Sequence, residues 1–89
     1  MKDRFERTFF SRVHRYSLGI DRKADGHYLE IPVSNMMVDY GEAYVITPAQ
    51  YSAFMSDETG ATKFADECRR REHDDLLIFQ PGTDRGVPR

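Results

Sequence analysis

Apolar and polar residues alternate along the first half of the chain with a period of two, which indicates half-buried strands. The first such stretch covers residues 10–20, and the second covers residues 27–33. A third apolar stripe runs through residues 36–46, where we expect one bent strand with a bulge near Gly41. Together these stretches predict a three-stranded antiparallel meander.

The connections refine this meander. The polar loop after the first strand ends in Asp25-Gly26, a dipeptide suited to the positive φ of hairpin turns. Pro32 lacks the amide hydrogen that a sheet ladder needs, so the second strand lies at an edge or is bulged at this position. Residues 1–10 fit a helix and the start of a strand equally well, and their conformation stays open.

The strand signal ends at Thr47, where a helix begins. The Thr47 side chain can cap this helix, Pro48 takes its first position, and Gln50 completes a capping box. Apolar residues then recur at helical spacing in two blocks, which predict a helix ending in the polar segment 57–60 and a second helix over residues 61–72. One kinked helix is the alternative, but we favour two because this polar segment contains a glycine.

The end of the chain completes the fold prediction. An apolar run at residues 76–79 predicts a last strand inside the sheet, and residues 81–89 are expected to form a loose tail. Strands that come first and helices that come later predict an α+β domain over residues 1–80, and not a parallel α/β fold. The predicted architecture is therefore the meander, a pair of helices, and a C-terminal strand that joins the sheet.

Composition is that of a soluble globular domain. The 89 residues are 39% hydrophobic and 31% charged, which indicates neither disorder nor a fibre. The single cysteine excludes an internal disulfide, and no apolar segment has signal-peptide or membrane-spanning length, so we expect a cytoplasmic protein without membrane contact. A formal net charge of −2 argues against a dedicated nucleic-acid binder.

No residue pattern specifies a catalytic or cofactor site. The sequence has no Gly-rich phosphate loop, no nucleophile elbow and no dinucleotide fingerprint. Cys68 falls on the apolar stripe of the second predicted helix, which indicates a buried structural thiol and not a nucleophile. We therefore expect no cofactor and favour a protein that is not an enzyme.

Histidines and carboxylates are the candidates for a metal site. Imidazole and carboxylate groups are common metal ligands, but their spacing here fits no closed ligand motif. His14 is more simply interpreted as a hydrogen-bonded residue beside the core, although a partner such as Glu30 or Asp39 would let it act as a general base. The metal candidates are His14, His27, His73, Asp74 and Asp75.

Arginines and tyrosines are the candidates for contacts with other molecules. Three consecutive arginines end the second predicted helix, where cations complement the negative end of the helix dipole. They point about 100° apart, so they form no single patch by themselves. Arginine pairs well with carboxylates and tyrosine is common at interfaces. The interaction candidates are Arg69, Arg70, Arg71, Tyr28 and Tyr40.

The hypothesis we favour is a small non-enzymatic protein that works through contacts, as a homo-oligomer or as an accessory or inhibitory partner of another protein. The first alternative is a small-molecule or metal-binding protein, including an enzyme whose site is completed at an oligomer interface. The second alternative is weak nucleic-acid binding through Arg12, Arg15 and the arginines at positions 69–71.

Overall fold

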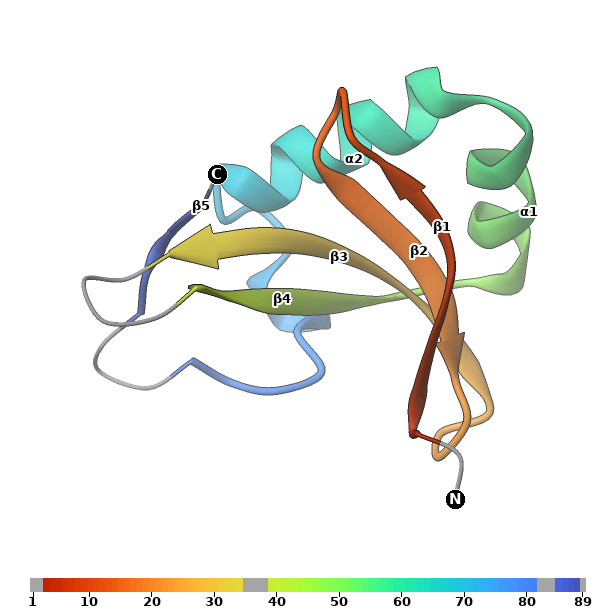
Figure 1. The fold of residues 1–89 in the computed structure, drawn as a ribbon, viewed down its shortest axis with the longest axis horizontal. Helices are drawn as coiled ribbons and strands as arrows, with labels where there is room; N and C mark the ends of the chain where they lie inside the picture. The colour runs from red at the N-terminus through yellow and green to blue at the C-terminus, as the bar shows by residue number, and fades with distance from the viewer. Residues whose placement is uncertain (1–2, 35–38, 82–84, 89) are drawn as a thin grey trace.

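The structure, a computed structural model, describes residues 3–34, 39–81 and 85–88. Its elements are β1 (Phe5–Ser11), β2 (Tyr16–Asp21), β3 (Gly26–Ser34), β4 (Asp39–Ile46), α1 (Pro48–Ser56), α2 (Glu58–Arg69), the 3₁₀ turn η1 (Asp74–Leu76) and β5 (Val87–Pro88). The first four strands form an antiparallel sheet in sequence order, and β5 pairs with β3 (Figure 1). The predicted α+β class is confirmed, with four strands in the meander where three were expected.

The additional strand comes from the stretch that was predicted as the first strand. Residues 12–15 form a turn in the middle of this stretch, so its two ends belong to β1 and β2, which pair with each other. Arg15 takes a positive φ of 57° in the turn, and the Arg69 guanidinium donates hydrogen bonds to the carbonyl oxygens of His14 and Arg15. Strand β1 gives residues 5–10 of the N-terminal segment an extended conformation, which the sequence left open.

The register of the sheet differs from the prediction in the position of its bulge. Pro32 and Gly41 pair in regular register, so the described part of β4 has no bulge near Gly41. The register shift lies instead in β1, between Arg7 and Phe9. The pairing of β2 with β3 stops at Glu30, which leaves Pro32 beyond the end of that neighbouring strand. Residues 36–38 of the predicted third strand lie outside the described residues.

The capped helix start and the two separate helices are confirmed. The Gln50 amide donates to Thr47 Oγ1 at 3.0 Å, and the Thr47 amide donates to Gln50 Oε1 at 2.8 Å. Asp57 alone separates α1 from α2, so α2 begins earlier than predicted and Gly60 lies in its first turn. Within the described segments, neither helix has the length and apolar character needed to cross a membrane.

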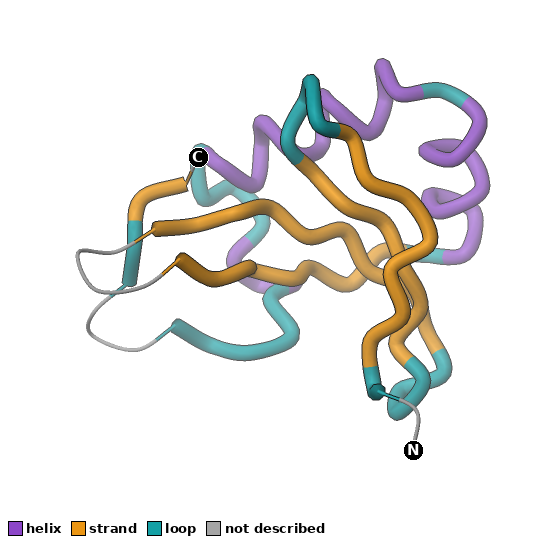
Figure 2. The backbone as a smooth tube through the Cα atoms, viewed as in Figure 1, coloured by secondary structure: helices purple, strands orange, loops and turns teal. Residues whose placement is uncertain are grey.

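Both helices pack on one face of the sheet and lie along the same side of the strands (Figure 2). The core forms between this face and the helices, because alternate strand residues point toward it. Its members from the strands are Tyr16, Leu18, Leu29, Ile31, Val33, Tyr44 and Ile46, and those from the later elements are Phe54, Ala61, Phe64, Ala65, Cys68 and Leu77.

The C-terminal strand lies later in the chain than the sequence predicted. Instead of forming a strand inside the sheet, the apolar run ends η1 and adds a single bridge between Leu77 and Tyr44. Phe79 is 61% exposed. The strand that joins the sheet is β5, within the segment predicted as a loose tail, and it pairs with the end of β3. An apolar run indicates burial, but it does not distinguish a strand from a short turn with one bridge.

Candidate functional site

Two of the proposed metal ligands lie on other elements than the turn that carries His73, Asp74 and Asp75. His14 is exposed in the turn between β1 and β2, and its backbone amide donates to Ser11 Oγ at 3.1 Å. His27 is half-buried in β3, where its ring packs against Tyr51 with the centroids 4.3 Å apart. Across residues 3–34, 39–81 and 85–88, no three His, Cys, Asp or Glu side chains come together as a metal site would require.

The third histidine has structural partners in the turn after α2. The His73 ring stacks on Phe64, with centroids 4.5 Å apart and planes 9° apart, and its Nε2 lies 2.8 Å from Glu67 Oε1. This hydrogen bond lowers the pKa of Glu67 from its ordinary value. Asp75, two residues later, is exposed. His73 thus helps to end α2 against the core.

Cys68 lies on the buried face of α2, as the sequence predicted. It has no exposed surface, and burial raises the pKa of its thiol to about 12. A thiol with this pKa is almost fully protonated at neutral pH and is a poor nucleophile.

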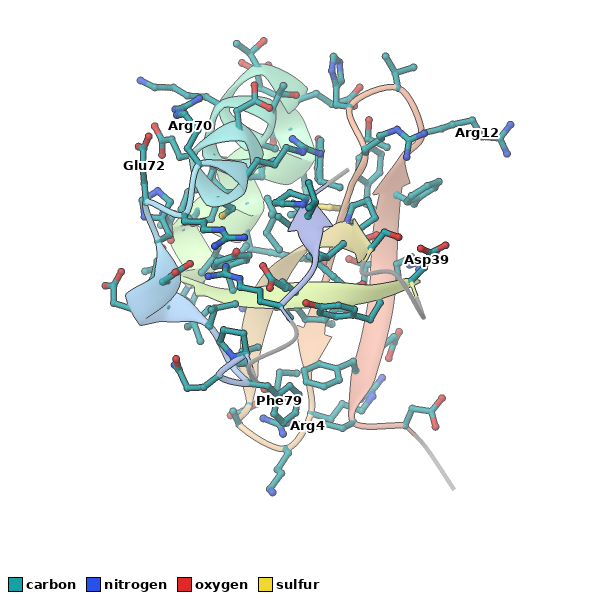
Figure 3. All side chains as sticks on the ribbon, turned by 90° about the vertical axis from the view of Figure 1, so that its left-hand side faces the viewer. Arg4, Arg12, Asp39, Arg70, Glu72 and Phe79 are labelled. Carbon is teal, nitrogen blue, oxygen red and sulfur yellow. The ribbon has the colours of Figure 1, made fainter. Side chains whose placement is uncertain are left out.

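The three consecutive arginines contact three different parts of the protein. Arg69 holds the turn between β1 and β2, as described above. Arg70 pairs with Glu72 on the protein surface, with Nε and Oε2 2.6 Å apart (Figure 3). Arg71 donates to the Gly86 carbonyl oxygen at 3.4 Å. The structure therefore distributes these interaction candidates and does not gather them in one patch.

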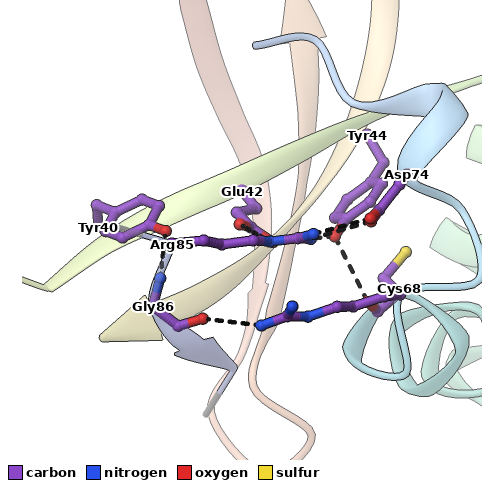
Figure 4. Close-up of polar contacts among 8 residues, drawn as sticks. Tyr40, Glu42, Tyr44, Cys68, Asp74, Arg85 and Gly86 are labelled. Atoms are coloured by element: carbon purple, nitrogen blue, oxygen red, sulfur yellow. Dashed lines mark hydrogen bonds and ion pairs between the residues drawn. The ribbon is translucent and has the colours of Figure 1, made fainter. Parts of the chain in front are cut away.

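A charged network joins the C-terminal segment to the sheet (Figure 4). The Arg85 guanidinium makes two hydrogen bonds to Glu42, at 2.9 and 3.0 Å, and two to Asp74, at 2.8 and 2.9 Å. Glu42 is only 5% exposed, and it also accepts from the Tyr44 hydroxyl at 3.1 Å. Paired hydrogen bonds of this kind are among the strongest polar contacts in proteins.

The Arg85 network anchors the segment that contains β5. Hydrogen bonds from Arg85 hold the pKa of Asp74 below its usual range, and burial raises that of Tyr44. The Gly86 amide donates to the Tyr40 hydroxyl at 2.9 Å. Tyr40, predicted as an interaction residue, therefore also helps to hold the segment that contains β5. Sequence reasoning missed the network, although Glu42 occupies an inward position of the third apolar stripe and so requires a partner.

The sheet face opposite the helices, here called the outer face, has a different character. Residues that pair directly across strands point to the same side of a sheet, so the register defines this face. Its members are Phe5, Arg7 and Phe10 of β1; Asp21, Gly19 and Ser17 of β2; Tyr28, Glu30 and Pro32 of β3; and Val45, Ala43 and Gly41 of β4.

Aromatic rings and one arginine form a cluster at one end of the outer face. The Phe5 ring lies edge-on to the rings of Tyr28 and Phe79, at centroid distances of 5.3 and 6.0 Å. The Arg4 guanidinium lies 4.8 Å from the Phe5 centroid and 5.2 Å from the Phe79 centroid. Arg4 and Phe79 are labelled at the lower end of Figure 3. Arg4 also makes two hydrogen bonds to Asp21, at 2.8 and 2.9 Å, which fix the guanidinium over the rings.

Two glycines let larger side chains lie flat on the outer face. A Cβ at Gly19 would come within 2.5 Å of the Tyr28 ring, and a Cβ at Gly41 would come within 2.5 Å of the Glu30 carboxyl carbon. The interaction candidate Tyr28 is consequently only 4% exposed. Such close approach is a common reason for glycine inside a strand.

The outer face also carries two charges on different strands. Glu30 is half-buried in β3, and this burial raises the pKa of its carboxyl group, with the nearby Arg7 acting in the opposite direction. The Arg7 guanidinium is exposed and lies 5.2 Å from the Phe10 ring centroid. Neither Arg7 nor Glu30 takes part in an ion pair with another described residue.

Sequence reasoning found Tyr28 but not the rest of the outer face. The unrecognised turn at residues 12–15 hid the pairing of β1 with β2, and the register shift in β1 changes which residues share a face.

Comparison with protein-family models, with curated proteins and with solved structures finds no significant match. The function is therefore interpreted from the residues of the site alone.

Proposed function

We propose that this protein acts through contacts with protein partners, and that the outer face is its contact surface. The observation that supports this most directly is the exposure of large apolar side chains on the sheet face without helices. Phe10 is 49% exposed and Val45 50%, and Phe79, which follows η1 and packs its ring on Phe5 at one end of this face, is 61% exposed. Aromatic residues and arginine are enriched at protein interfaces, and exposed apolar patches commonly mark them.

The polar side chains that could serve catalysis have structural roles, which favours a function through protein contacts over a catalytic function. Cys68 is buried and protonated, His73 is held by Phe64 and Glu67, and the Arg85 network is satisfied by its own members. These groups stabilise the fold, and this supports a role for the outer face in contacts over a catalytic role for the polar groups. A single buried thiol also fits the reducing cytoplasm.

Charge favours a protein over a nucleic acid as the ligand of this face. Exposed aromatic rings beside arginines can stack bases and pair with phosphates. The outer face, however, also carries the carboxylates of Asp21 and Glu30, and the Arg4 guanidinium is already paired with Asp21. Phosphate binding requires a concentrated basic surface, and the whole chain has a net charge of −2.

Site-directed photo-crosslinking tests the proposal. A benzoylphenylalanine placed at Val45 reports contacts of the outer face, and the same group at Lys63, an exposed residue of α2, is the matched control. After irradiation of intact cells, we expect discrete protein adducts from position 45 that are absent from position 63. The proposal is overturned by the absence of adducts at position 45, or by the same adducts at both positions.

A further inference from the structure

The outer face presents one cation and one anion that have no ion-pair partner among the described residues. Arg7 lies on β1 opposite Gly19, and Glu30 lies two strands away on β3. We propose that the partner of the outer face is a second copy of this chain, with Arg7 of each copy paired to Glu30 of the other. This inference rests on the proposed function, because it names the partner of that same surface.

The geometry of the two charges suits a symmetric contact. Neighbouring strands lie about 4.8 Å apart, and β2 lies between β1 and β3, so two interstrand spacings separate the backbones of Arg7 and Glu30 by about 10 Å across the sheet. When two identical faces stack, a two-fold axis in the contact plane, midway between these residues, places each Arg7 over the partner's Glu30. A single contact then forms both ion pairs, as expected for an isologous interface.

The surroundings of Glu30 favour a guanidinium as its ligand. Its carboxyl group lies over Gly41 and is half-buried, but it accepts no hydrogen bond from the described residues. Burial raises the pKa of this carboxyl group, and Arg7 of the same chain opposes that shift without reaching ion-pair distance. A guanidinium from a second molecule can supply two parallel hydrogen bonds.

The apolar part of the face fits the same arrangement. Phe10 and Val45 are exposed at the two edge strands, while Tyr28 lies flat between them. Stacked sheets pack through such a layer of side chains, with a spacing of about 10 Å. A different protein would need an arginine and a carboxylate at matching positions, whereas a second copy carries both at the required spacing.

A charge-exchange experiment tests the inference. Arg7→Glu places a carboxylate at both pairing positions, and Glu30→Lys places a cation at both, so each variant repels itself. In sedimentation equilibrium we expect a dimer for the wild type, and dissociation constants at least about tenfold higher for each variant alone. Mixing the two variants pairs opposite charges at both positions, and we expect dimers to return. Arg70→Glu, an exposed change directly after α2, should leave dimerisation unchanged.

Folding of the variants is checked by circular dichroism. If Glu30→Lys does not fold, Glu30→Gln removes the charge with little change in shape and should raise the dissociation constant by about threefold or more. Effects of Arg7→Glu confined to stability would indicate a role within the chain, whereas the recovery in the mixture can come only from contact between chains.

Several outcomes overturn the inference. The inference fails if the wild type is monomeric at all concentrations, if the variants dimerise as well as the wild type, or if the mixture of the two variants stays monomeric. Crosslinking from position 45 distinguishes a failure of the homodimer inference from a failure of the proposed contact surface. Adducts of position 45 with a different protein would remove the second copy but retain the contact surface, whereas no adducts would remove both.

Discussion

The phenol ring of Tyr28 lies across Gly19 of the neighbouring strand. A Cβ at position 19 would meet the ring at 2.5 Å and would also contact the backbone carbonyl oxygen of Glu6. Gly19→Ala therefore forces the ring or β1 to move. We expect the free energy of unfolding to fall by about 1–3 kcal/mol, the usual range for overpacking, as measured by urea unfolding.

Gly26→Ala is the matched control for this prediction. A Cβ at Gly26 would have its nearest neighbour at 3.9 Å, and its backbone φ is not positive. We expect no loss, and a gain of up to about 1 kcal/mol because alanine restricts the unfolded chain. Equal losses at the two positions would contradict the close contact between Tyr28 and Gly19.

Arg85 holds two carboxylates, one of which is buried. Arg85→Ala would leave Glu42 without its cation, and breaking a buried pair in this way typically removes about 3–5 kcal/mol of stability. Urea unfolding measures the loss. The control is Arg70→Ala, which removes the exposed pair with Glu72 and should change stability little, because solvent screens surface ion pairs. A small loss at both positions would show that the network is not needed for folding.

Stability should decrease in acid because two aspartates have lowered pKa values in the folded state. Hydrogen bonds from Arg4 lower the pKa of Asp21, and those from Arg85 lower that of Asp74. The stabilisation is complete above the unfolded pKa of about 4 and is lost as the pH falls through the folded values. Glu30, whose pKa is raised, acts in the opposite direction.

Urea midpoints measured between about pH 7 and pH 2 test this acid dependence. Asp21→Asn should be less stable at neutral pH and should show a shallower decrease than the wild type. An equally steep decrease in the variant would show that Asp21 does not contribute to the acid dependence.

The thiol of Cys68 should react only when the protein unfolds. Its folded pKa of about 12 lies far above the ordinary value of about 8.5, so at pH 8 the folded thiolate fraction is about a thousandfold lower than in the unfolded chain. We expect a thiol reagent to label the protein rapidly in urea and very slowly in native buffer, as measured by mass spectrometry. Rapid and complete labelling in native buffer would contradict the burial of Cys68.

The prediction was most accurate where it depended on residues that are close in sequence. The capping box of Thr47 and Gln50 involves neighbours in sequence, so residue types alone were sufficient to predict it. The turn at residues 12–15 was missed because it contains no glycine, proline or asparagine, and Arg15 supplies the positive φ.

Long-range contacts account for the other differences. The C-terminal segment is held by Arg85, whose partner Glu42 lies on β4, and no local pattern shows that the two meet. The outer face likewise depends on the order and register of four strands. The sequence indicated Tyr28 as a contact residue, but only the position of Gly19 explains why this ring lies flat and buried.

The bulge in β1 adds one residue to this strand without changing which residues pair on either side of it. Arg7 pairs with Gly19 and Phe9 pairs with Leu18, so Thr8 is an extra residue between two regular segments. Its hydroxyl oxygen lies 2.6 Å from the Tyr51 hydroxyl, which links the bulge to α1. Loss of the Thr8 codon would leave the pairing on both sides intact and would remove the hydrogen bonds of this side chain, to the Tyr51 hydroxyl and to the Leu18 carbonyl oxygen. The gene can therefore vary by one codon here without exchanging the inner and outer faces of the sheet.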